Sequence, residues 1–539
     1  MIHRYIFVVG GVMSGVGKGT SAAALGLTLG AKGFKVTAIK IDPYVNVDAG
    51  TMNPVEHGEV FVTVDGDECD QDIGTYERYL DTNITSKNYM TTGRVYQTVI
   101  ERERNLEYGG KCVEVVPHVP LEIISRIERA AKDAKADIAL VEIGGTVGEY
   151  QNILFLEAAR MMKAQHPDRV KFVLVSYLPV PPSIGEMKTK PTQYAVRTLN
   201  SAGIQADFVV GRSEMSMDRP RKEKIAQFCS VPWDHIISAP DAKSVYLIPD
   251  MFEEQGFASK ILKSFGLRAK KNDLTAWHAF TNKIEKAKKI VKIAVIGKYF
   301  STGDFTLSDA YISVLEAIKH AAADSDVKAE IHWLNAEEYE KSETAVKELS
   351  SYDGVLIPGG FGSRGIEGKI RAIRYCREKK IPYLGLCYGM QCAVIEYARN
   401  VLGWKDSNTT EIDNKTTHPV IHLLAGQDKL MKGKHYGGTL RLGAYGCELK
   451  ANTTVRKAYG ESMIEERHRH RYEFNNEYRA ELEKAGLVIS GVNPEKDLVE
   501  IVELKDHPFF VGVQFHPEFQ SRPLRPHPLF KAFIKASSR

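Results

Sequence analysis

A glycine-rich turn near the N-terminus combines residue types that bind phosphate. An apolar run at 5–9 leads into the turn from Ser14 to Thr20, SGVGKGT. Glycines allow several backbone N–H groups to face one anion at the start of a helix, Lys18 adds a positive charge, and Thr20 offers a hydroxyl for magnesium. The fit to G-x-x-x-x-G-K-[ST] is imperfect, because the first glycine is one place early and the hydroxyl one place late. The pattern also occurs as plain packing, yet a lysine among the glycines favours a phosphate-binding loop.

Cys387 lies in a pattern typical of a catalytic nucleophile. A predicted strand is followed by Gly385-Leu386-Cys387-Tyr388-Gly389, the G-x-nucleophile-x-G spacing of a hydrolase elbow. The start of the next helix favours the thiolate, which is the form that attacks a carbonyl carbon. A lone cysteine is more often a small buried residue, but glycines on both sides make that alternative the weaker one.

His516 and Glu518 are the candidate base and orienting acid for this thiol. They lie two residues apart in FFVGVQFHPEF, which predicts a strand that presents both side chains on one face. Spacing alone does not pair them with Cys387, and a lone histidine is usually structural.

Three further segments suit the binding of anions. The turn at 352–362, YDGVLIPGGFG, offers backbone N–H groups to an oxyanion. GEMKTKPTQ at 185–193 places two lysines on a rigid turn, which suits a second nucleoside triphosphate, although lysine-rich surface turns are common. ERHRHRYEFN at 466–475 suggests zinc through His468 and His470, but the interleaved arginines favour a carboxylate ligand.

Carboxylates follow the predicted strands of the first half of the chain. Lys40 and Asp42 close one strand, an acidic run ends at Asp72, and Glu142 lies at the end of the apolar stretch DIALVEI. A buried strand does not otherwise accommodate a glutamate, and a carboxylate beside a phosphate loop is a natural magnesium ligand. Most of the acidic run is explained as well by a solvated turn.

Composition narrows the class of protein. With 539 residues the chain is long enough for two to four domains, and a net charge of +4 gives no indication of nucleic-acid binding. The seven cysteines are odd in number and lack C-x-x-C pairs, which argues against a disulfide framework or a zinc ribbon and favours a reducing, cytoplasmic location. No apolar run approaches the roughly 18 residues that a membrane span needs.

The order of predicted elements favours an α/β fold with two doubly wound, mostly parallel, three-layer domains. Strands at 36–41, 137–143, 171–177 and 207–211 alternate with helices in the first half, and a new strand begins at Val291. Between them, lysines surround isolated apolar residues, which predicts a linker with a short helix. The predicted boundaries are 1–267 for the domain with the phosphate-binding loop, 268–291 for the linker and 292–539 for the domain with Cys387.

The motifs together resemble those of the CTP synthase family, the glutamine-hydrolysing amidotransferases that make CTP from UTP. DPYVNVDAGTMNP, HGEVFVT, GEMKTKPTQ, PGGFG, CYGMQ, ERHRHRYE and QFHPE occur in the family's order, and the resemblance covers nearly the whole chain. CYGMQ with QFHPE is similar to class I glutamine amidotransferases in general, whereas DPYVNVDAGTMNP and KTKPTQ point to this family in particular.

The resemblance implies a set of site residues. ATP would bind at Ser14, Gly15, Val16, Gly17, Lys18, Gly19, Thr20, Lys40 and Asp72, with Mg²⁺ on Asp72 and Glu142. UTP and the feedback inhibitor CTP would bind at Ser14, Glu149, Tyr150, Gln151, Lys188, Thr189, Lys190, Pro191, Thr192, Gln193 and Lys224. The glutaminase triad would be Cys387, His516 and Glu518, with glutamine held by Gly360, Tyr388, Gly389, Met390, Gln391, Glu411 and Arg471 and ammonia passing His57 and Val60.

The chemistry implied by the resemblance has two halves. ATP would phosphorylate the C4 oxygen of UTP, which is otherwise a poor leaving group, while Cys387 and His516 hydrolyse glutamine through a thioester. Ammonia would then reach C4 unprotonated along an internal passage. GTP as an allosteric activator, a homotetramer, and the absence of nucleic-acid or membrane partners are also implied.

Four departures from the family pattern qualify these expectations. Gly15 replaces a usual serine but keeps the turn possible, and Tyr388 replaces a common leucine and is expected to contribute only its backbone. Glu149-Tyr150-Gln151 stands where Asp-Ile-Glu is usual, so feedback by CTP is expected to be altered. The segment 426–443 is short for the loop around GTP, which weakens the expectation of activation.

Two other functions are compatible with parts of the pattern. A catalytically idle assembly protein is conceivable, but the intact Cys387, His516, Glu518, Lys18 and Glu142 argue against it. The second is an amidotransferase that aminates a different acceptor.

Overall fold

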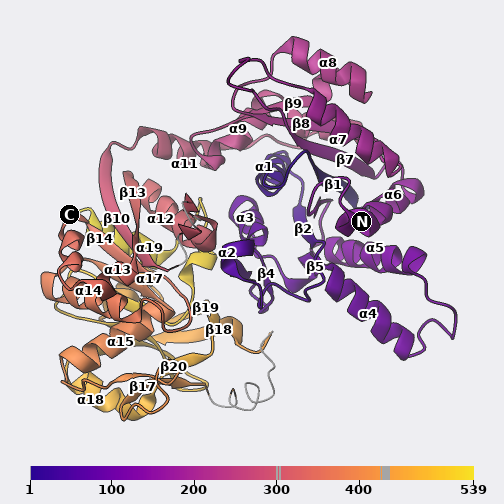
Figure 1. Ribbon diagram of the computed structural model, residues 1–539. Helices are drawn as coiled ribbons and strands as arrows, with labels where there is room; N and C mark the ends of the chain where they lie inside the picture. Colours follow the sequence, from indigo (N-terminus) through magenta and orange to yellow (C-terminus); the bar gives the residue numbers. More distant parts are fainter. Residues whose placement is uncertain (1, 299–300, 303–304, 307, 425–426, 428–437) are drawn as a thin grey trace. The chain divides into compact units, whose positions relative to one another are not determined.

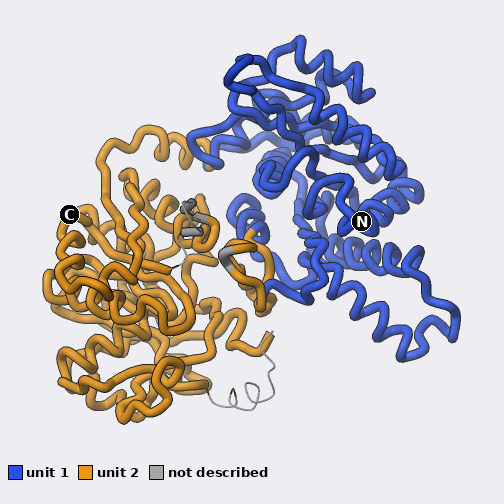
Figure 2. The backbone as a smooth tube through the Cα atoms, in the orientation of Figure 1, with its two compact units in different colours: residues 1–49, 72–276 blue, residues 50–71, 277–539 orange. Residues whose placement is uncertain are grey.

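The chain folds into two compact units. The computed structural model describes residues 2–298, 301–302, 305–306, 308–424, 427 and 438–539. One unit comprises residues 1–49 and 72–276, and the other comprises residues 50–71 and 277–539 (Figure 2). Residues 50–71 fall within the predicted domain 1–267 of the sequence, yet they pack with the second unit.

A parallel sheet of seven strands forms the centre of the first unit (Figure 1). Its spatial order is β5 (Tyr89–Thr91), β2 (Val36–Asp42), β6 (Ile138–Ile143), β1 (Arg4–Gly11), β7 (Val170–Tyr177), β8 (Phe208–Ser213) and β9 (Ile236–Pro240). The strands are short, rich in β-branched residues and buried almost throughout, as parallel strands covered on both faces must be. The predicted strands of this half therefore form one sheet.

Helices cover both faces of this sheet. Alternate residues of β1 point to opposite sides, and Tyr5, Phe7 and Val9 join a core with α4 to α8. Helix α1 contacts β2 and β6 and packs with α9 and α10. The helices are α1 (Lys18–Ala31), α3 (Gln71–Leu80), α4 (Thr92–Arg104), α5 (Val115–Asp133), α6 (Ile153–Gln165), α7 (Lys190–Ser201), α8 (Arg219–Cys229), α9 (Ile248–Glu254) and α10 (Phe257–Ser264).

The second unit is built on a mixed sheet of nine strands. The order is β13 (Val327–Asn335), β10 (Lys289–Gly297), β14 (Gly354–Ile357), β15 (Tyr383–Leu386), β23 (Phe510–Val513), β22 (Leu498–Glu503), β21 (Val488–Asn493), β18 (Arg441–Leu449) and β19 (Met463–His470). The first five strands are parallel and the remaining pairs are antiparallel. The α/β class in two domains is thus confirmed, with a mixed second sheet.

Two cores lie on the two faces of this second sheet. On β10, Ala294 and Ile296 belong to one core, and Ile293 and Val295 belong to the other, as the period of two in a strand requires. The covering helices are α12 (Ile312–Asp324), α13 (Ala336–Lys341), α14 (Ile366–Lys379), α15 (Tyr388–Asn400), α17 (Thr454–Tyr459), α18 (Arg479–Lys484) and α19 (Pro528–Ser537). The predicted linker contains α11 (Thr275–Lys286) and the start of β10.

The segment 50–71 carries the hairpin of β3 (Val60–Val62) and β4 (Glu68–Asp70), preceded by α2 (Pro54–His57). Its backbone is bonded to the second unit, because Ala444 N donates to Val64 O at 3.0 Å and the Arg467 guanidinium donates to Val62 O at 3.0 Å. Phe61 also packs on Phe519, with ring centroids 4.9 Å apart. These bonds explain why the segment groups with residues far along the chain.

In the part of the chain that the structure describes, no helix combines the length and apolarity needed to cross a bilayer.

An ion pair joins α14 and α15 in the second unit. The Arg377 guanidinium donates to both oxygens of Glu396 at 2.8–3.2 Å, and Glu396 is fully buried. We expect Arg377→Met to lower the free energy of unfolding by about 3–5 kcal/mol, because it leaves a buried carboxylate without its partner. Urea unfolding followed by tryptophan fluorescence measures the loss.

The control is Arg374→Met on the same helix. Arg374 pairs with Glu378 at 2.8 Å, but about half of each side chain is exposed. Because water screens such a pair, we expect a change within about 0.5 kcal/mol. Equal losses in the two variants would show that the buried pair does not stabilise the packing of α14 on α15.

Candidate active sites

Cys387 occupies the bend between β15 and α15. Its backbone has φ 49° and ψ −99°, a conformation that is costly for a residue other than glycine. The Cys387 N–H donates to Val513 O at 2.7 Å on the neighbouring strand β23. A Cβ atom on Gly389 would lie 2.3 Å from Ile357 O, so only glycine lets the helix approach β14 this closely. The bend has the geometry of a nucleophile elbow.

His516 reaches the thiol from the adjacent strand. Leu386 and Val513 are paired in register at the ends of β15 and β23, so the residues that follow both strands emerge at the same edge of the sheet. The predicted strand through His516 and Glu518 is wrong: β23 ends at Val513, and Pro517–Gln520 forms a 3₁₀ turn. Pro517 has no N–H to donate and fixes φ near the helical value, which favours the turn.

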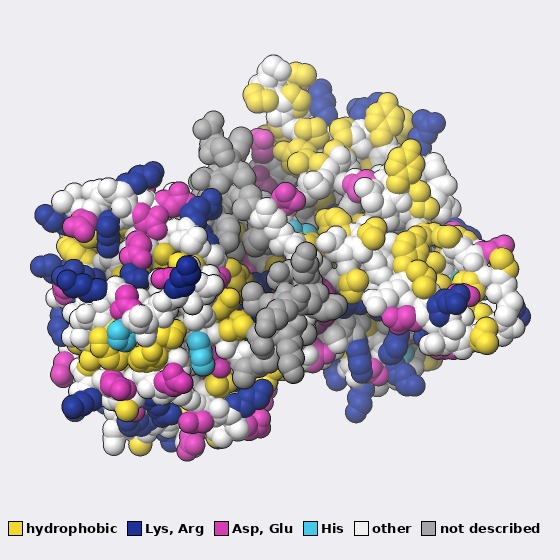
Figure 3. Space-filling model, turned by 60° about the horizontal axis from the view of Figure 1, so that its bottom comes forward, with side chains coloured by type: hydrophobic (Ala, Val, Ile, Leu, Met, Phe, Trp, Pro, Cys, Tyr) yellow, Lys and Arg dark blue, Asp and Glu magenta, His cyan; other side chains and the backbone are white. Residues whose placement is uncertain are grey.

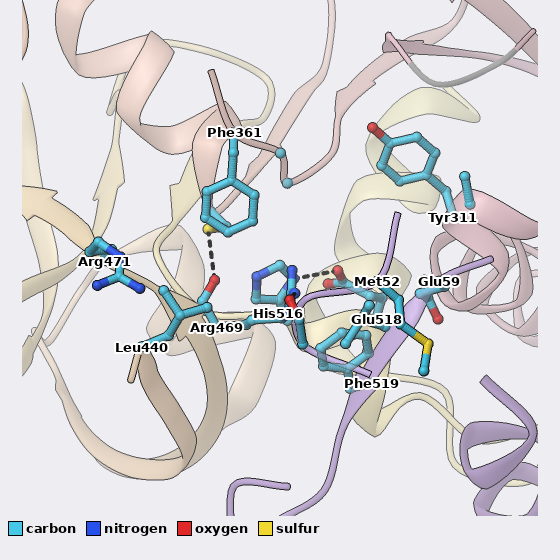
Figure 4. A pocket seen from close by; sticks show the side chains of 16 residues that line it. Met52, Glu59, Tyr311, Phe361, Leu440, Arg469, Arg471, His516, Glu518 and Phe519 are labelled. Carbon is cyan, nitrogen blue, oxygen red and sulfur yellow. Dashed lines mark hydrogen bonds and ion pairs between the residues drawn. The ribbon is translucent and has the colours of Figure 1, made fainter. Parts of the chain in front are cut away.

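The turn orients the imidazole. His516 Nδ1 lies 2.7 Å from Glu518 Oε1, the contact drawn as a dashed line in Figure 4. Within the described residues, His516 Nε2 is buried and has no hydrogen-bond partner. Burial by itself would lower the pKa of His516, but the charges of Glu518 and Cys387 outweigh it and raise the pKa to about 10. The imidazole is therefore protonated near neutral pH and places a positive charge beside the Cys387 sulfur.

Two polar groups that the sequence did not single out contact the Cys387 sulfur. Gln514 Nε2 lies 3.6 Å from it, and the carbonyl oxygen of Arg469 lies 3.8 Å from it. Gln514 in turn accepts a bond from Gln391 Nε2 at 3.3 Å, and this amide also donates to Tyr472 O at 2.8 Å. Gln514, which follows the end of β23, and a backbone carbonyl of β19 are not recognisable from sequence as neighbours of a cysteine.

A cavity of about 310 Å³ opens at the thiol (Figure 4). Its lining comprises Gly50, Met52, Glu59, Val60, Ala310, Tyr311, Gly359, Gly360, Phe361, Cys387, Leu440, Arg469, Arg471, His516, Glu518 and Phe519. The triad candidates therefore share one cavity with Gly360, Arg471 and Val60. His57 and Glu411 are not among its described lining residues. Met52 and Glu59 come from the segment 50–71, within the motifs DPYVNVDAGTMNP and HGEVFVT, but the sequence analysis assigned neither residue to a site.

The remaining predicted glutamine contacts surround this cavity. Glu411 Oε1 accepts the N–H of Gly362 at 2.7 Å, beside the turn that lines the cavity. The Arg471 guanidinium donates to Gln427 Oε1 at 2.7 Å and to Thr439 Oγ1 at 2.9 Å. Met390 is fully buried in the core of the unit.

His468 and His470, which the sequence offered as possible zinc ligands, are both buried, and His468 Nδ1 lies 3.0 Å from His470 Nε2. Burial lowers the pKa of both histidines well below the usual value.

The first unit gathers the predicted phosphate-loop lysine and carboxylates at the ends of its central strands. Lys40 on β2 is in register with Glu142 on β6, so their side chains emerge on one face. Lys40 Nζ donates to Glu142 Oε1 at 3.1 Å and also bonds Asp72 Oδ2. Helix α1 begins at Lys18, within the predicted phosphate loop, and Lys18 Nζ donates to Gly145 O at 2.8 Å.

The electrostatics of this cluster show crowded negative charge. Burial and the charge of Asp72 raise the pKa of Glu142, although Lys40 and Lys18 act against the shift. Burial also raises the pKa of Asp42 to about 6. Tyr76 donates a hydrogen bond to the second oxygen of Glu142, a contact that no motif in the sequence indicated. Neighbouring carboxylates of this kind offer the oxygen ligands that divalent cations prefer.

The first unit has a cavity of about 470 Å³ at the lysine-rich turn. Its lining comprises Glu186, Met187, Lys188, Thr189, Lys190, Pro220, Arg221 and Lys224. The structure thus brings Lys224 of α8 to the turn that carries Lys188 and Lys190. Pro191, Thr192 and Gln193 are not part of the described lining, and Thr192 bonds Ser176 at 2.8 Å instead. Arg221, which the sequence analysis missed, adds a positive charge.

Of the two segments that depart from the family pattern, the structure describes 149–151 fully and 426–443 only in part. Glu149 accepts the N–H of Thr146 at 2.8 Å, and Tyr150 is 91% exposed. The short segment predicted at 426–443 lies for the most part outside the described residues.

Comparison with known proteins shows what each half of the chain is similar to. The family model "CTP synthase N-terminus" matches residues 4–267, and "Glutamine amidotransferase class-I" matches residues 306–536. The CTP synthase of Carboxydothermus hydrogenoformans is 50% identical over 99% of this chain and 98% of its own length. That of Geobacillus kaustophilus is 48% identical over 99% of both chains. The solved glutaminase domain of Trypanosoma brucei CTPS with bound acivicin is 39% identical over 46% of this chain and 93% of that chain, with a TM-score of 0.42.

The fold and the family matches define a class I glutamine amidotransferase unit joined to an α/β synthetase unit. The relatives that match over nearly the whole chain all belong to one family within this class. The chain belongs to the CTP synthase family.

The charge state of His516 predicts how Cys387 reacts with iodoacetamide. Since the pKa of His516 is about 10, we expect the alkylation rate of Cys387 to stay nearly constant between pH 7 and 9. Glu518→Gln removes a charge that raises this pKa, so His516 becomes neutral at lower pH. The rate should then be several-fold lower at pH 7 and rise with pH.

Mass spectrometry gives the rate at Cys387 separately from the other cysteines. The exposed Cys112 is the internal control, and its rate must agree in the two proteins at each pH. Identical pH profiles at Cys387 with and without Glu518 would contradict the assigned role of the carboxylate.

Proposed function

We propose that the chain aminates UTP to CTP, using ATP and the ammonia that it releases from L-glutamine. The observation that carries this proposal is the Cys387, His516 and Glu518 arrangement at a cavity in one unit. The lysine and carboxylate cluster of the other unit supports it. The relatives' name supplies the acceptor, because both units match that family over nearly their full length.

The glutaminase step follows from the geometry of the thiol site. The Cys387 thiolate attacks the carboxamide carbon, and backbone N–H groups of the turn at Gly359 and Gly360 stabilise the oxyanion. His516, which carries a proton at neutral pH, gives it to the leaving nitrogen, so that ammonia departs and a thioester remains. A water molecule then gives a proton back to His516 as it attacks the thioester, and glutamate is released. Glu411 and Arg471 are proposed to hold the substrate's amino and carboxylate ends.

The synthetase step is assigned to the first unit. The loop Ser14–Thr20 and Lys18 hold the phosphates of ATP, and Lys40 stabilises charge on the transferred phosphoryl group. Asp72 and Glu142 fit Mg²⁺, since Glu142 is buried and its pKa is raised in part by the charge of Asp72. Mg²⁺ would neutralise charge on the phosphates of ATP there. Phosphorylation makes the C4 oxygen of UTP a leaving group for ammonia.

The cavity at the lysine-rich turn of the first unit is the proposed binding site for the UTP phosphates. Lys188, Lys190, Arg221 and Lys224 surround it, and nearby acids partly pair them, with Lys188 Nζ 2.7 Å from Glu186 Oε2. A triphosphate would displace these weak surface pairs. CTP is proposed to share this place as feedback inhibitor, with Glu149, Tyr150 and Gln151 altering its response. GTP is proposed as an activator.

The passage of ammonia is proposed to begin at the thiol cavity. Val60 lines this cavity, and His57 lies three residues before it on the same segment. Apolar lining residues keep the ammonia from being protonated by bulk water.

Assembly into a homotetramer is proposed from the surface of the first unit. Several large apolar side chains are exposed there, among them Tyr150 at 91%, Tyr194 at 62% and Ile184 at 59%. Figure 3 shows hydrophobic side chains gathered in the right half of the view, amid scattered charges. Exposed apolar clusters of this kind mark protein contacts. The free state of the seven cysteines fits a cytoplasmic location.

Cys387→Ala separates the two halves of the proposed reaction. CTP formation is followed by absorbance with UTP, ATP and magnesium, and the nitrogen source is either glutamine or ammonium chloride. We expect the glutamine-dependent rate to fall at least 1,000-fold, because no thioester can form, and the ammonium-dependent rate to stay within about twofold.

The matched control is Cys376→Ala, a buried cysteine of α14 that lies outside the site. It should keep both rates. If the parent forms no CTP from either source but still hydrolyses glutamine, the acceptor is not UTP.

A further inference from the structure

Gly362 holds the turn that lines the thiol cavity. Its N–H donates to Glu411 Oε1 at 2.7 Å, and its carbonyl oxygen accepts the Tyr388 hydroxyl at 2.8 Å and Lys298 Nζ at 3.4 Å. Both peptide units that meet at Gly362 are therefore held by side chains.

The position of this turn matters to the reacting groups. Gly359, Gly360 and Phe361 share the cavity with Cys387 and His516. A Cβ atom on Gly359 would lie 2.8 Å from Cε1 of His516, so the turn runs directly against the imidazole. A small displacement of the turn would move its N–H groups away from the developing oxyanion.

Tyr388 is the residue that joins this turn to the nucleophile. It follows Cys387 directly as the first residue of α15, and only 1% of it is exposed. Its hydroxyl contacts the far end of the turn, twenty-six residues back along the chain. The sequence analysis expected only the backbone of Tyr388 to contribute, and the structure adds the side chain to that expectation.

The tyrosine ring also lies against two ammonium groups. Lys369 Nζ is 4.8 Å from the ring centroid, and Lys298 Nζ is 5.8 Å from it. Lys369 is fully buried, and within the described residues its Nζ has no hydrogen-bond partner. The negative face of the ring offsets part of the cost of burying that charge. A leucine at 388 would provide neither the hydroxyl nor the ring.

We propose that Tyr388 is a positioning residue for glutamine hydrolysis: its hydroxyl ties the Gly359–Gly362 turn to the helix that begins at Cys387. The face of the ring also interacts with the buried ammonium group of Lys369. This inference rests on the proposed glutamine hydrolysis. Because the turn meets the oxyanion only during reaction, the hydroxyl acts on kcat more than on KM.

Tyr388→Phe removes the hydroxyl and keeps the ring over the lysines. We expect kcat for glutamate release to fall about tenfold, less than the loss of an oxyanion donor itself, with KM for glutamine within twofold. CTP formation from ammonium chloride should not change. The matched control is Tyr397→Phe on the same helix, whose hydroxyl donates to Ala485 O at 2.7 Å, away from the cavity. It should lose a similar amount of thermal stability and keep kcat.

Three results would overturn the proposal: kcat of Tyr388→Phe within twofold of the parent, a rise in KM at unchanged kcat, or an equal loss of kcat in Tyr397→Phe. Glutamate release is measured without reference to CTP. A parent that hydrolyses glutamine but makes no CTP would therefore contradict the proposed acceptor and leave this test intact. A parent that hydrolyses no glutamine would contradict both.

A second pair of variants tests the ring. Tyr388→Leu leaves Lys369 buried without its aromatic neighbour and should lower the unfolding temperature. Combining it with Lys369→Met removes the charge and should restore most of that loss. If the two substitutions destabilise additively, the ring does not shield the lysine.

Discussion

The strained backbone of Cys387 is the constraint on which the thiol site depends. A residue at φ 49° persists only when its surroundings fix it, and here they do so through the bond of its N–H to Val513 O. The Tyr383 hydroxyl adds a bond to Gly389 O at 2.9 Å. The same pairing of β15 with β23 that holds the bend also brings His516 to it. Sheet register, rather than any local motif, therefore assembles the nucleophile and its base.

Buried charge is handled in a similar way in both units. At the thiol, Glu518 compensates the burial of His516 and keeps the imidazole charged. In the first unit, Lys40 lies between Glu142 and Asp72, and the pKa of Glu142 is raised despite that neighbour. At the thiol site, the charges of the protein's own residues compensate one another. The cluster in the first unit retains an excess of negative charge, which a divalent metal ion would balance.

The sequence indicated the strands, the elbow and the carboxylates well, because each has a local signal. An apolar run, glycines around a cysteine and a glutamate in a buried strand are all visible in a few neighbouring residues. It misplaced His516 and Glu518 on a strand, since period-two spacing does not reveal that Pro517 opens a turn. It also gave no sign that residues 50–71 pack with the second unit, because Arg467 and the hairpin are four hundred residues apart. The contacts of Gln514 with Cys387 and of Tyr76 with Glu142 also join residues far apart in the chain, which no local pattern reveals.

The most direct test of the account follows glutamate and CTP together in one reaction of the intact chain with glutamine, UTP, ATP and magnesium. The account predicts that the two products accumulate in equal amounts, and that omitting UTP abolishes CTP without inactivating Cys387. Glutamate formed at full rate with no CTP, under conditions where all substrates are present, would contradict the claim that the two sites serve one reaction.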